Sequence, residues 1–190
     1  MKDTVRVATA DDAPALYRLL QQSYAPLAQQ GIHFTITRTP FEQVREKVLR
    51  ESTFVLERTH SPHAETEIVA TLTVRFPWLS QDEQAPPYPF IHWFAVSERY
   101  KRQGAGSALL DHVETAFLRA QIKAPAVYLA TAVGHPWLRN VYERRGYEPF
   151  RHSINALGTP LVWLRKILIA DIYRDLPEAR RPSRDELTTS

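Results

Sequence analysis

The sequence predicts a domain of the α/β or α+β class, in which helices surround one sheet. Short runs of β-branched and aromatic residues are mixed along the chain with segments whose apolar residues recur at helical spacing. The chain has 190 residues, 44% of them hydrophobic, which is enough for one core and short for two. No internal repeat is visible, so a single globular domain is expected.

The N-terminal region predicts a strand followed by a helix. Residues 4–8 (TVRVA) place Val5 and Val7 on one face of a short strand. Asp11 and Asp12 are residue types that cap a helix. The apolar residues that follow at helical spacing are Leu16, Leu19, Leu20, Tyr24 and Leu27.

A second helix and a hairpin are expected next. The helix would begin at Thr39 and Pro40, with Glu42 completing a capping box. Its buried stripe would consist of Phe41, Val44 and Val48. The runs 53–59 and 67–76 are rich in β-branched residues, which predicts an antiparallel hairpin.

The centre of the chain predicts a buried strand. The proline-rich stretch 84–89 is expected to be a loop, and residues 90–96 (FIHWFAV) form a nearly continuous apolar run, typical of a strand covered on both faces. A helix is predicted over about 104–120, and a further buried strand over 126–132.

The C-terminal part predicts one more helix and one more strand. The helix spans 135–146 and ends at Gly146, which is a C-cap residue type. The last strand spans 161–168. We expect the domain to comprise residues 1–170, with 171–190 as a surface arm or disordered tail.

Composition excludes several classes of function. The formal charge is +3, with 24 basic and 21 acidic residues scattered along the chain, so no nucleic-acid footprint is indicated and an anionic small ligand would suit equally well. The chain has no cysteine, which excludes disulfides, thiolate metal sites and a cysteine nucleophile. No apolar N-terminal leader is visible, and Arg165 and Lys166 interrupt the most apolar C-terminal segment. A soluble cytoplasmic protein is expected.

Residues 99–114, RYKRQGAGSALLDHVE, join the central strand to the third predicted helix. A helix N-terminus has unpaired N–H groups and a partial positive charge, so it readily holds phosphate. Gly104 and Gly106 would let an anion approach the backbone, and Lys101 and Arg102 add charge. The alternative is that the two glycines only make a tight turn.

Other phosphate motifs do not fit this segment. A dinucleotide fingerprint needs a third glycine at position 109, where the chain has Leu109. A P-loop needs Gly-Lys-Ser/Thr, whereas Gly106 is followed by Ser107 and Ala108.

The segment WFAVSERYKRQGAGSALLDHVE resembles motif A of the GCN5-related N-acetyltransferase (GNAT) family. The family pattern is Arg/Gln-x-x-Gly-x-Gly/Ala, after a strand whose last apolar residue precedes the first glycine by eight positions. Val96 precedes Gly104 by that spacing. The first motif position is Lys101, which keeps the charge and loses the fork geometry of arginine.

The resemblance implies a fold and a cofactor. The fold would be a mixed, mostly antiparallel central sheet flanked by helices and splayed between its fourth and fifth strands. The cofactor would be acetyl-coenzyme A, with its pyrophosphate on the turn amides and its pantetheine arm along the end of the central strand. The residues implied in cofactor binding are Phe94, Ala95, Val96, Lys101, Arg102, Gln103, Gly104, Ala105, Gly106, Ser107 and His135.

Residues 142–147 (YERRGY) resemble a second motif of the family, apolar-Tyr-x-x-x-Gly-Phe/Tyr. The family usually has Asn seven residues and Ala four residues before this tyrosine, whereas this chain has His135 and Leu138. By resemblance, Tyr142 would be the general acid that protonates the departing sulfur. A phenol packed on the apolar face of its helix is the structural alternative.

His92 is a candidate general base. Strand alternation predicts that residues 90, 92, 94 and 96 share one face, so His92 would lie beside Phe90. It resembles one of the paired strand histidines of arylalkylamine N-acetyltransferases, and a pKa near 6.5 suits proton relay. A core histidine held by a hydrogen bond is an equally open reading. The sequence indicates no metal site.

The acceptor side of this fold would be lined by aromatic residues. The residues expected to bind substrate are Tyr24, Phe34, Trp78, Tyr88 and Phe90. Such a lining favours an amine on an apolar or aromatic body, or an amino-acid derivative.

The function that follows from the resemblance is acetyl-CoA-dependent N-acetylation of a small-molecule primary amine, by direct transfer in a ternary complex. The absence of cysteine agrees with direct transfer. One alternative is a non-catalytic acyl-CoA sensor of the same fold. Another is a nucleic-acid-associated protein that contacts phosphates through Lys101, Arg102, Arg144 and Arg145. A homodimer is expected by analogy alone.

Overall fold

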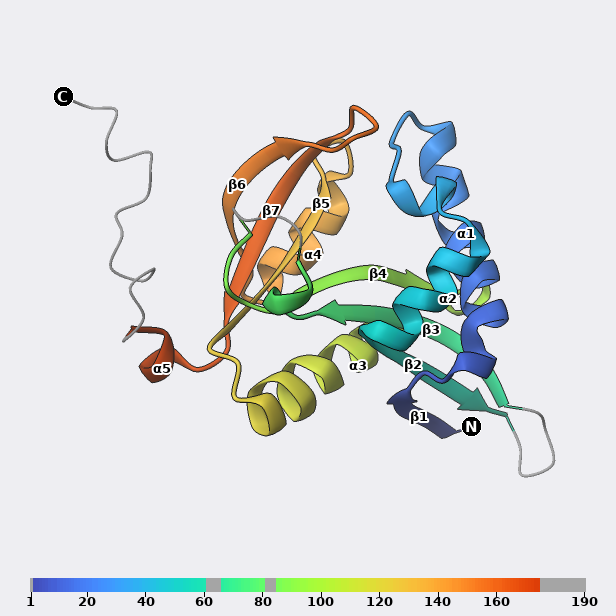
Figure 1. The fold of residues 1–190 in the computed structure, drawn as a ribbon, viewed down its shortest axis with the longest axis horizontal. Helices are drawn as coiled ribbons and strands as arrows, with labels where there is room; N and C mark the ends of the chain where they lie inside the picture. The colour runs from blue at the N-terminus through green and yellow to red at the C-terminus, as the bar shows by residue number, and fades with distance from the viewer. Residues whose placement is uncertain (1, 61–65, 81–84, 175–190) are drawn as a thin grey trace.

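The computed structural model describes residues 2–60, 66–80 and 85–174. Figure 1 shows a twisted sheet with helices on both of its faces. In chain order, the strands and α-helices are β1 (Lys2–Val7), α1 (Ala13–Gln29), α2 (Phe41–Arg50), β2 (Ser52–Thr59), β3 (Thr66–Arg75), β4 (Phe90–Val96), α3 (Ala105–His112), β5 (Ala126–Ala132), α4 (Pro136–Arg144), β6 (Glu148–Ile154), β7 (Pro160–Ile167) and α5 (Ala170–Arg174). Short 3-10 helices are η1 (Ala10–Asp12), η2 (Thr35–Arg38), η3 (Pro77–Leu79) and η4 (Glu98–Tyr100), and α3 continues into the π-helical η5 (Val113–Ile122).

The described strands form one seven-stranded sheet in the order β1-β2-β3-β4-β5-β7-β6. Every neighbouring pair is antiparallel except β4 and β5, which are parallel. These two strands pair only at Phe90–Tyr128 and Ile91–Leu129 and then diverge. The predicted class is therefore confirmed: a mixed, mostly antiparallel sheet, flanked by helices and splayed between its fourth and fifth strands.

Helices cover the two faces of the first four strands separately. On one face, α1 and α2 bury the apolar stripes that helical spacing predicted, including Leu16, Leu20, Val44 and Val48. On the other face, α3 and η5 bury their own apolar residues, including Leu109, against β3 and β4. Figure 1 shows α1 and α2 on the opposite side of the sheet from α3.

The predicted capping box of the second helix is wrong. Pro40 is the N-cap residue of α2, and the Thr39 hydroxyl donates instead to the Thr35 carbonyl of η2, at 2.9 Å. A capping box occurs instead at η1, the 3-10 helix that leads into α1, where Asp12 accepts from the Thr9 N–H at 2.7 Å.

Two elements were missed by sequence patterns. The strand β6 has mostly exposed side chains and contains a proline, so it lacks the alternation that marks a half-buried strand. It is nevertheless an edge strand paired with β7. The short helix α5 lies where the tail was expected to begin, and its Tyr173 is buried against Tyr88. The remainder of the predicted tail, 175–190, lies outside the described residues, as does part of each of the loops predicted around 61–66 and 84–89.

Within the described parts of the chain, no helix has the length and apolar character needed to cross a membrane.

Candidate active site

The central strand β4 contains a bulge. The register of β4 against β3 shifts between Thr71 and Thr73, so that β4 carries an extra residue there. Trp93 lies at the shift with φ of 51°, a conformation that non-glycine residues rarely adopt. Such bulges re-aim the side chains that follow them.

The bulge exchanges the faces of β4, so the prediction that all its even-numbered residues share one face is wrong. Phe94 and Val96 pack against Gly106 at the start of α3. His92, by contrast, faces the other side of the sheet, where it contacts Glu51 at the end of α2. The side chain of the predicted base and those of Phe94 and Val96 therefore lie on opposite faces of the sheet, whereas Ala95 packs on the α1–α2 face.

The splay leaves backbone carbonyls on the side of β4 that faces away from β3. The Phe94 carbonyl accepts a hydrogen bond from the Tyr24 hydroxyl at 3.2 Å, and the Val96 carbonyl accepts one from the Ser23 hydroxyl at 3.4 Å. The Ser97 N–H donates to the Val69 carbonyl of β3 at 2.8 Å, so by the alternation of an antiparallel ladder the backbone polar groups of Ala95 point towards β3. Tyr24, expected on the acceptor side, thus lies with its hydroxyl at the opening between the strands.

The glycine turn leads directly from β4 into α3. Gly104 has φ of +83° and open space around its α-carbon, so its role is conformational. The first hydrogen bond of α3 runs from the Ala108 N–H to the Gly104 carbonyl at 2.9 Å. Among the described residues, the N–H groups of Ala105, Gly106 and Ser107 have no backbone acceptor, as expected for a first helical turn.

Gly106 has a different role from Gly104. A Cβ atom at Gly106 would lie 3.0 Å from Val96 Cγ2 and 3.3 Å from Phe94 Cζ. The missing side chain therefore allows the start of α3 to pack closely on β4. This contact brings the free amides next to the splayed strand.

The remaining turn residues are held by side-chain contacts. The Gln103 amide donates to the Arg99 carbonyl at 2.9 Å and accepts from Arg58 at 3.2 Å. Lys101 pairs with Glu98 at 2.5 Å, and Arg102 is exposed with φ of 60°.

His135 lies at the N-terminus of α4, near this turn. Burial lowers its pKa, and the positive charge of Lys101 lowers it further. Its Nδ1 atom is buried and has no hydrogen-bond partner among the described residues. An unpaired buried acceptor or donor of this kind fits a ligand group at the site.

Tyr142 is buried in α4, with its ring edge-on to Tyr147 at 5.7 Å. Burial raises the pKa of its phenol, and the Tyr24 phenol adds to the effect. Tyr147 is fixed by donating to the buried Glu114 at 2.8 Å, which also accepts from Lys166 at 2.5 Å.

His92 and Glu51 form a buried pair. The His92 Nε2 and Glu51 Oε2 atoms are 2.5 Å apart, and the two side chains are 12% and 7% exposed. Burial opposes ionisation of Glu51, but the hydrogen bond from His92 and the nearby cations outweigh it and lower its pKa. Burial also lowers the pKa of His92, although Glu51 partly opposes that shift. Because Glu51 is ionised, His92 Nε2 carries the proton and Nδ1 is the basic atom.

Two cations surround this pair. Lys47 Nζ is 3.6 Å from Glu51 Oε1 and lies 5.3 Å from the Trp93 ring. Arg75, at the end of β3, lies opposite Phe90 in the sheet, with its Cζ atom 5.0 Å from the phenyl ring. Both cations contribute to lowering the pKa values of Glu51 and His92.

An aromatic cluster adjoins the His92–Glu51 pair and its two cations. The Phe90 ring is stacked on His92 at 5.5 Å and lies 4.9 Å from Tyr128 and 5.5 Å from Trp163. Phe90 and Trp163 are half-buried, whereas Tyr128 is buried. The region therefore combines a basic imidazole, cations and an apolar surface.

The other predicted aromatic residues lie in different places. Phe34 packs edge-on against Tyr24 at 5.5 Å, between α1 and η2. Tyr88 is buried in a small core cluster with Tyr128 and Tyr173. The structure does not bring Trp78 to the site: it is 74% exposed and stacks on Phe76 at 4.6 Å, in the core cluster that contains α3.

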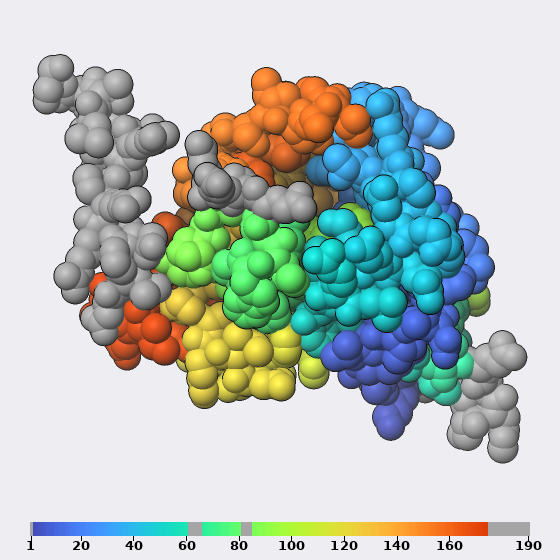
Figure 2. Space-filling model, in the orientation of Figure 1, coloured from blue at the N-terminus to red at the C-terminus, as the bar shows by residue number. Residues whose placement is uncertain are grey.

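A contact between distant segments lies across the open end of the splay. The His33 N–H donates to the Thr159 hydroxyl at 2.9 Å, and the His33 carbonyl accepts from Asn155 at 2.8 Å. Figure 1 shows the α1–η2 loop beside the β6–β7 turn. In the space-filling view, the surface is hollowed between the orange β6–β7 region and the cyan α2 region (Figure 2).

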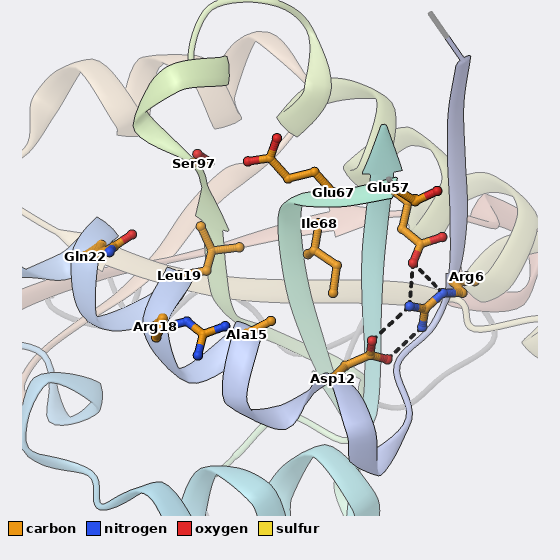
Figure 3. Close-up of a pocket in the computed structure, with 11 residues that line it drawn as sticks. Arg6, Asp12, Ala15, Arg18, Leu19, Gln22, Glu57, Glu67, Ile68 and Ser97 are labelled. Atoms are coloured by element: carbon orange, nitrogen blue, oxygen red, sulfur yellow. Dashed lines mark hydrogen bonds and ion pairs between the residues drawn. The ribbon is translucent and has the colours of Figure 1, made fainter. Parts of the chain in front are cut away.

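A pocket of about 420 Å³ lies elsewhere, between α1 and strands β2 and β3. Figure 3 shows its dominant feature, Arg6, which bridges Asp12 and Glu57. The ion pairs fasten the start of α1 to the sheet. None of the predicted site residues lines this pocket.

Glu51 and Arg75 were missed by the sequence analysis. Glu51 follows a helix in which acidic and basic residues alternate, so nothing distinguishes it from a solvated residue. Arg75 ends a β-rich run as an ordinary polar residue. The position of Arg75 beside His92 depends on its being opposite Phe90 in the sheet, and no local sequence pattern specifies that register.

The sequence is similar to one protein family and to two characterised enzymes. The sequence profile of the acetyltransferase (GNAT) family matches residues 14–147. An S-alkylcysteine N-acetyltransferase of Bacillus subtilis (strain 168) is 42% identical over 174 residues, which cover 90% of this chain and 92% of that protein. An S-(2-succino)cysteine N-acetyltransferase of the same strain is 34% identical over 174 residues, which cover 90% of this chain and 100% of that protein.

A solved structure has the same fold. The ribosomal-protein-S18-alanine N-acetyltransferase from Escherichia coli superimposes with a TM-score of 0.63, over 88% of this chain and 95% of that chain. The two sequences are 16% identical, so this similarity concerns the fold alone.

Proposed function

This chain belongs to the acetyltransferase (GNAT) family and is an N-acetyltransferase, and on that premise we propose that it transfers the acetyl group of acetyl-CoA to the α-amino group of an S-substituted cysteine. The acceptor class is suggested by the names of the two Bacillus relatives. The pairing of a basic imidazole with an aromatic surface on the acceptor face supports it.

Several groups of this chain fit acetyl-CoA, which supplies a reactive acetyl thioester when bound. The free N–H groups of Ala105, Gly106 and Ser107 suit its pyrophosphate, with Lys101 adding charge beside them. The unpaired Nδ1 of His135 supplies a further polar contact at the same end of the site. These observations support the cofactor assignment made from the glycine motif.

The splayed part of β4 suits the pantetheine arm. Carbonyls on the open side of a strand can pair with amides of an extended ligand. Those of Phe94 and Val96 are the carbonyls concerned, while Ala95 faces β3. Binding of a pantetheine amide at these carbonyls would require Tyr24 and Ser23 to share or release their hydrogen bonds.

His92 is proposed as the base that takes a proton from the acceptor amine. An α-ammonium group must lose a proton before its nitrogen can attack a carbonyl carbon. A neutral His92 accepts that proton at Nδ1, while Nε2 remains bonded to Glu51. The Glu51 carboxylate then stabilises the imidazolium, in the manner of a histidine–carboxylate pair.

Tyr142 is proposed to hold the proton that the departing sulfur requires. Its raised pKa keeps the phenol protonated at neutral pH. The chain contains no cysteine that could carry the acetyl group. Direct transfer within a ternary complex is therefore the route that these residues support.

The buried Glu51–His92 pair beside an aromatic surface is the observation that carries this proposal. The test is a substrate panel with purified protein and acetyl-CoA, in which release of the CoA thiol is measured. We expect turnover with S-methyl-, S-ethyl- and S-benzyl-L-cysteine, and turnover at least tenfold lower with spermidine and with an alanyl peptide. Preference for spermidine or the peptide, or binding of acetyl-CoA without turnover of any amine, would refute the proposed acceptor.

A further inference from the structure

We propose that Arg75 binds the α-carboxylate of the acceptor and thereby selects amino acids over simple amines. The inference rests on the proposed function, since it concerns the same acceptor site. Neither a sequence motif nor the names of the relatives assigns a role to this residue.

The position of Arg75 follows from the register of the sheet. Thr73 lies opposite His92, and Arg75 lies opposite Phe90, two residues further along each strand. Because alternate residues of a strand share a face, Arg75 projects from the face that carries His92. Its guanidinium group lies over the Phe90 ring, which itself stacks on His92.

The charge of Arg75 reaches both members of the proton-accepting pair. It is among the groups that lower the pKa of Glu51 and that of His92, after burial and the contact between the two. This influence agrees with the strand register in placing the guanidinium close to the imidazole. An anionic substrate group at Arg75 would therefore lie close to an amine at His92.

Arg75 is also available for a ligand. Among the described residues it forms no ion pair, whereas Lys47, the other cation beside His92, is paired with Glu51 at 3.6 Å. A guanidinium presents two parallel N–H donors that match a carboxylate. A half-buried guanidinium that forms no ion pair can bind a ligand anion without first breaking an existing pair.

The chemistry of an α-amino acid matches this arrangement. Its amine and carboxylate are attached to the same carbon, so a base for one and a cation for the other must lie side by side. The third substituent would then extend over Phe90 and Trp163, whose half-buried rings offer an apolar surface to an S-alkyl group and are backed by the buried Tyr128. A simple amine would leave the guanidinium without an anion.

The experiment compares S-benzyl-L-cysteine with S-benzylcysteamine, which lacks only the carboxylate, as acceptors for wild-type and variant proteins. For wild-type protein we expect kcat/KM to favour the amino acid by about 100-fold. At about pH 8, where His92 is neutral in both proteins, Arg75→Gln should lower kcat/KM for the amino acid by about 100-fold and change that for the cysteamine far less. Arg75→Lys should recover part of the loss, because it keeps the charge without the fork.

A matched control is Arg45→Gln, which removes a half-exposed arginine of α2 that lies 3.8 Å from Glu42. It should leave both substrates unaffected. Acetyl-CoA affinity and the urea midpoint of each variant show whether the fold and the donor site are intact.

The outcomes separate this inference from the proposed function. If wild-type protein acetylates both compounds equally, or if Arg75→Gln lowers both equally, Arg75 does not bind the carboxylate, although the N-acetylation of thioether amines stands. If wild-type protein binds acetyl-CoA and acetylates neither compound, the proposed acceptor is wrong and this inference falls with it.

Discussion

Glu51→Gln should move the acidic limb of the kcat–pH profile to lower pH and reduce the plateau rate. The carboxylate of Glu51 raises the pKa of His92, although burial keeps that pKa below its ordinary value of 6.5. Removing the negative charge removes the raising effect, so His92 becomes harder to protonate. The variant therefore keeps its base neutral at a lower pH than wild-type protein does.

The size of the shift follows from the contact. His92 Nε2 and Glu51 Oε2 are 2.5 Å apart, and both side chains are largely buried, so solvent screens their interaction only weakly. A hydrogen bond to a charged group contributes roughly 1.5–3 kcal/mol, and one pKa unit corresponds to about 1.4 kcal/mol. The glutamine side chain keeps an oxygen that can accept the hydrogen bond from His92. We therefore expect the lower end of this energy range, which corresponds to a shift of about one unit in the pKa of His92. A weaker and less fixed base should also lower the plateau by about tenfold.

The assay is kcat at saturating acetyl-CoA and S-benzyl-L-cysteine between pH 5 and 9, by thiol release. Use of kcat rather than kcat/KM reports groups in the bound complex and avoids titration of the free amine. The matched control is Glu46→Gln, which removes an exposed carboxylate of α2 that pairs with Arg50 at 3.0 Å. Its profile should coincide with that of wild-type protein.

A limb that moves to higher pH would refute the reasoning, because it would mean that Glu51 does not favour the protonated imidazole. An unchanged limb and an unchanged plateau would show that the pair takes no part in proton transfer. A lower plateau with an unmoved limb would leave Glu51 a structural role only.

Three further changes test other parts of the site and fold. Tyr142→Phe should lower kcat by about 100-fold, while the KM for acetyl-CoA stays within about twofold in steady-state kinetics, since only the proton at the sulfur is lost. Gly106→Ala should lower the free energy of unfolding by about 1–3 kcal/mol in urea denaturation, because its Cβ would lie 3.0 Å from Val96 Cγ2. Asp12→Asn should destabilise the protein most above pH 4: the bond from Arg6 lowers the pKa of Asp12 from 3.8 to about 2, so the carboxylate stabilises the fold above 3.8 and loses this effect as pH falls towards 2.

Each of these expectations can fail on its own. Unchanged kcat in Tyr142→Phe would remove its acid role. An unaltered urea midpoint in Gly106→Ala would mean that α3 can shift off β4 at no cost. An equal loss of stability at pH 3 and pH 7 in Asp12→Asn would show that the charge of the carboxylate is not what stabilises the fold.

The sequence by itself located the proposed cofactor site. A helix that begins after glycine has free N–H groups in any fold, and the resemblance of the segment around Gly104 to motif A of the family pointed to an anion site there. Helical periodicity likewise located α1, α2 and α3, because one buried face dictates the pattern. Tyr142 and Gly146 were singled out by the resemblance to the family's second motif, and both lie in one short helix and its C-terminal turn.

The surroundings of His92, where the acceptor is proposed to bind, were decided only by tertiary structure. A single extra residue at Trp93 exchanges the faces of β4, and no local propensity marks such a bulge in an apolar run. Glu51 reaches His92 across 41 positions of sequence because the end of α2 packs over β4. Arg75 joins them through the register of β3. The contacts of His92 with Glu51 and of Phe90 with Arg75 depend on the register of the strands and on the packing of α2 against the sheet. Alternation and capping patterns in the sequence specify neither the register nor the packing.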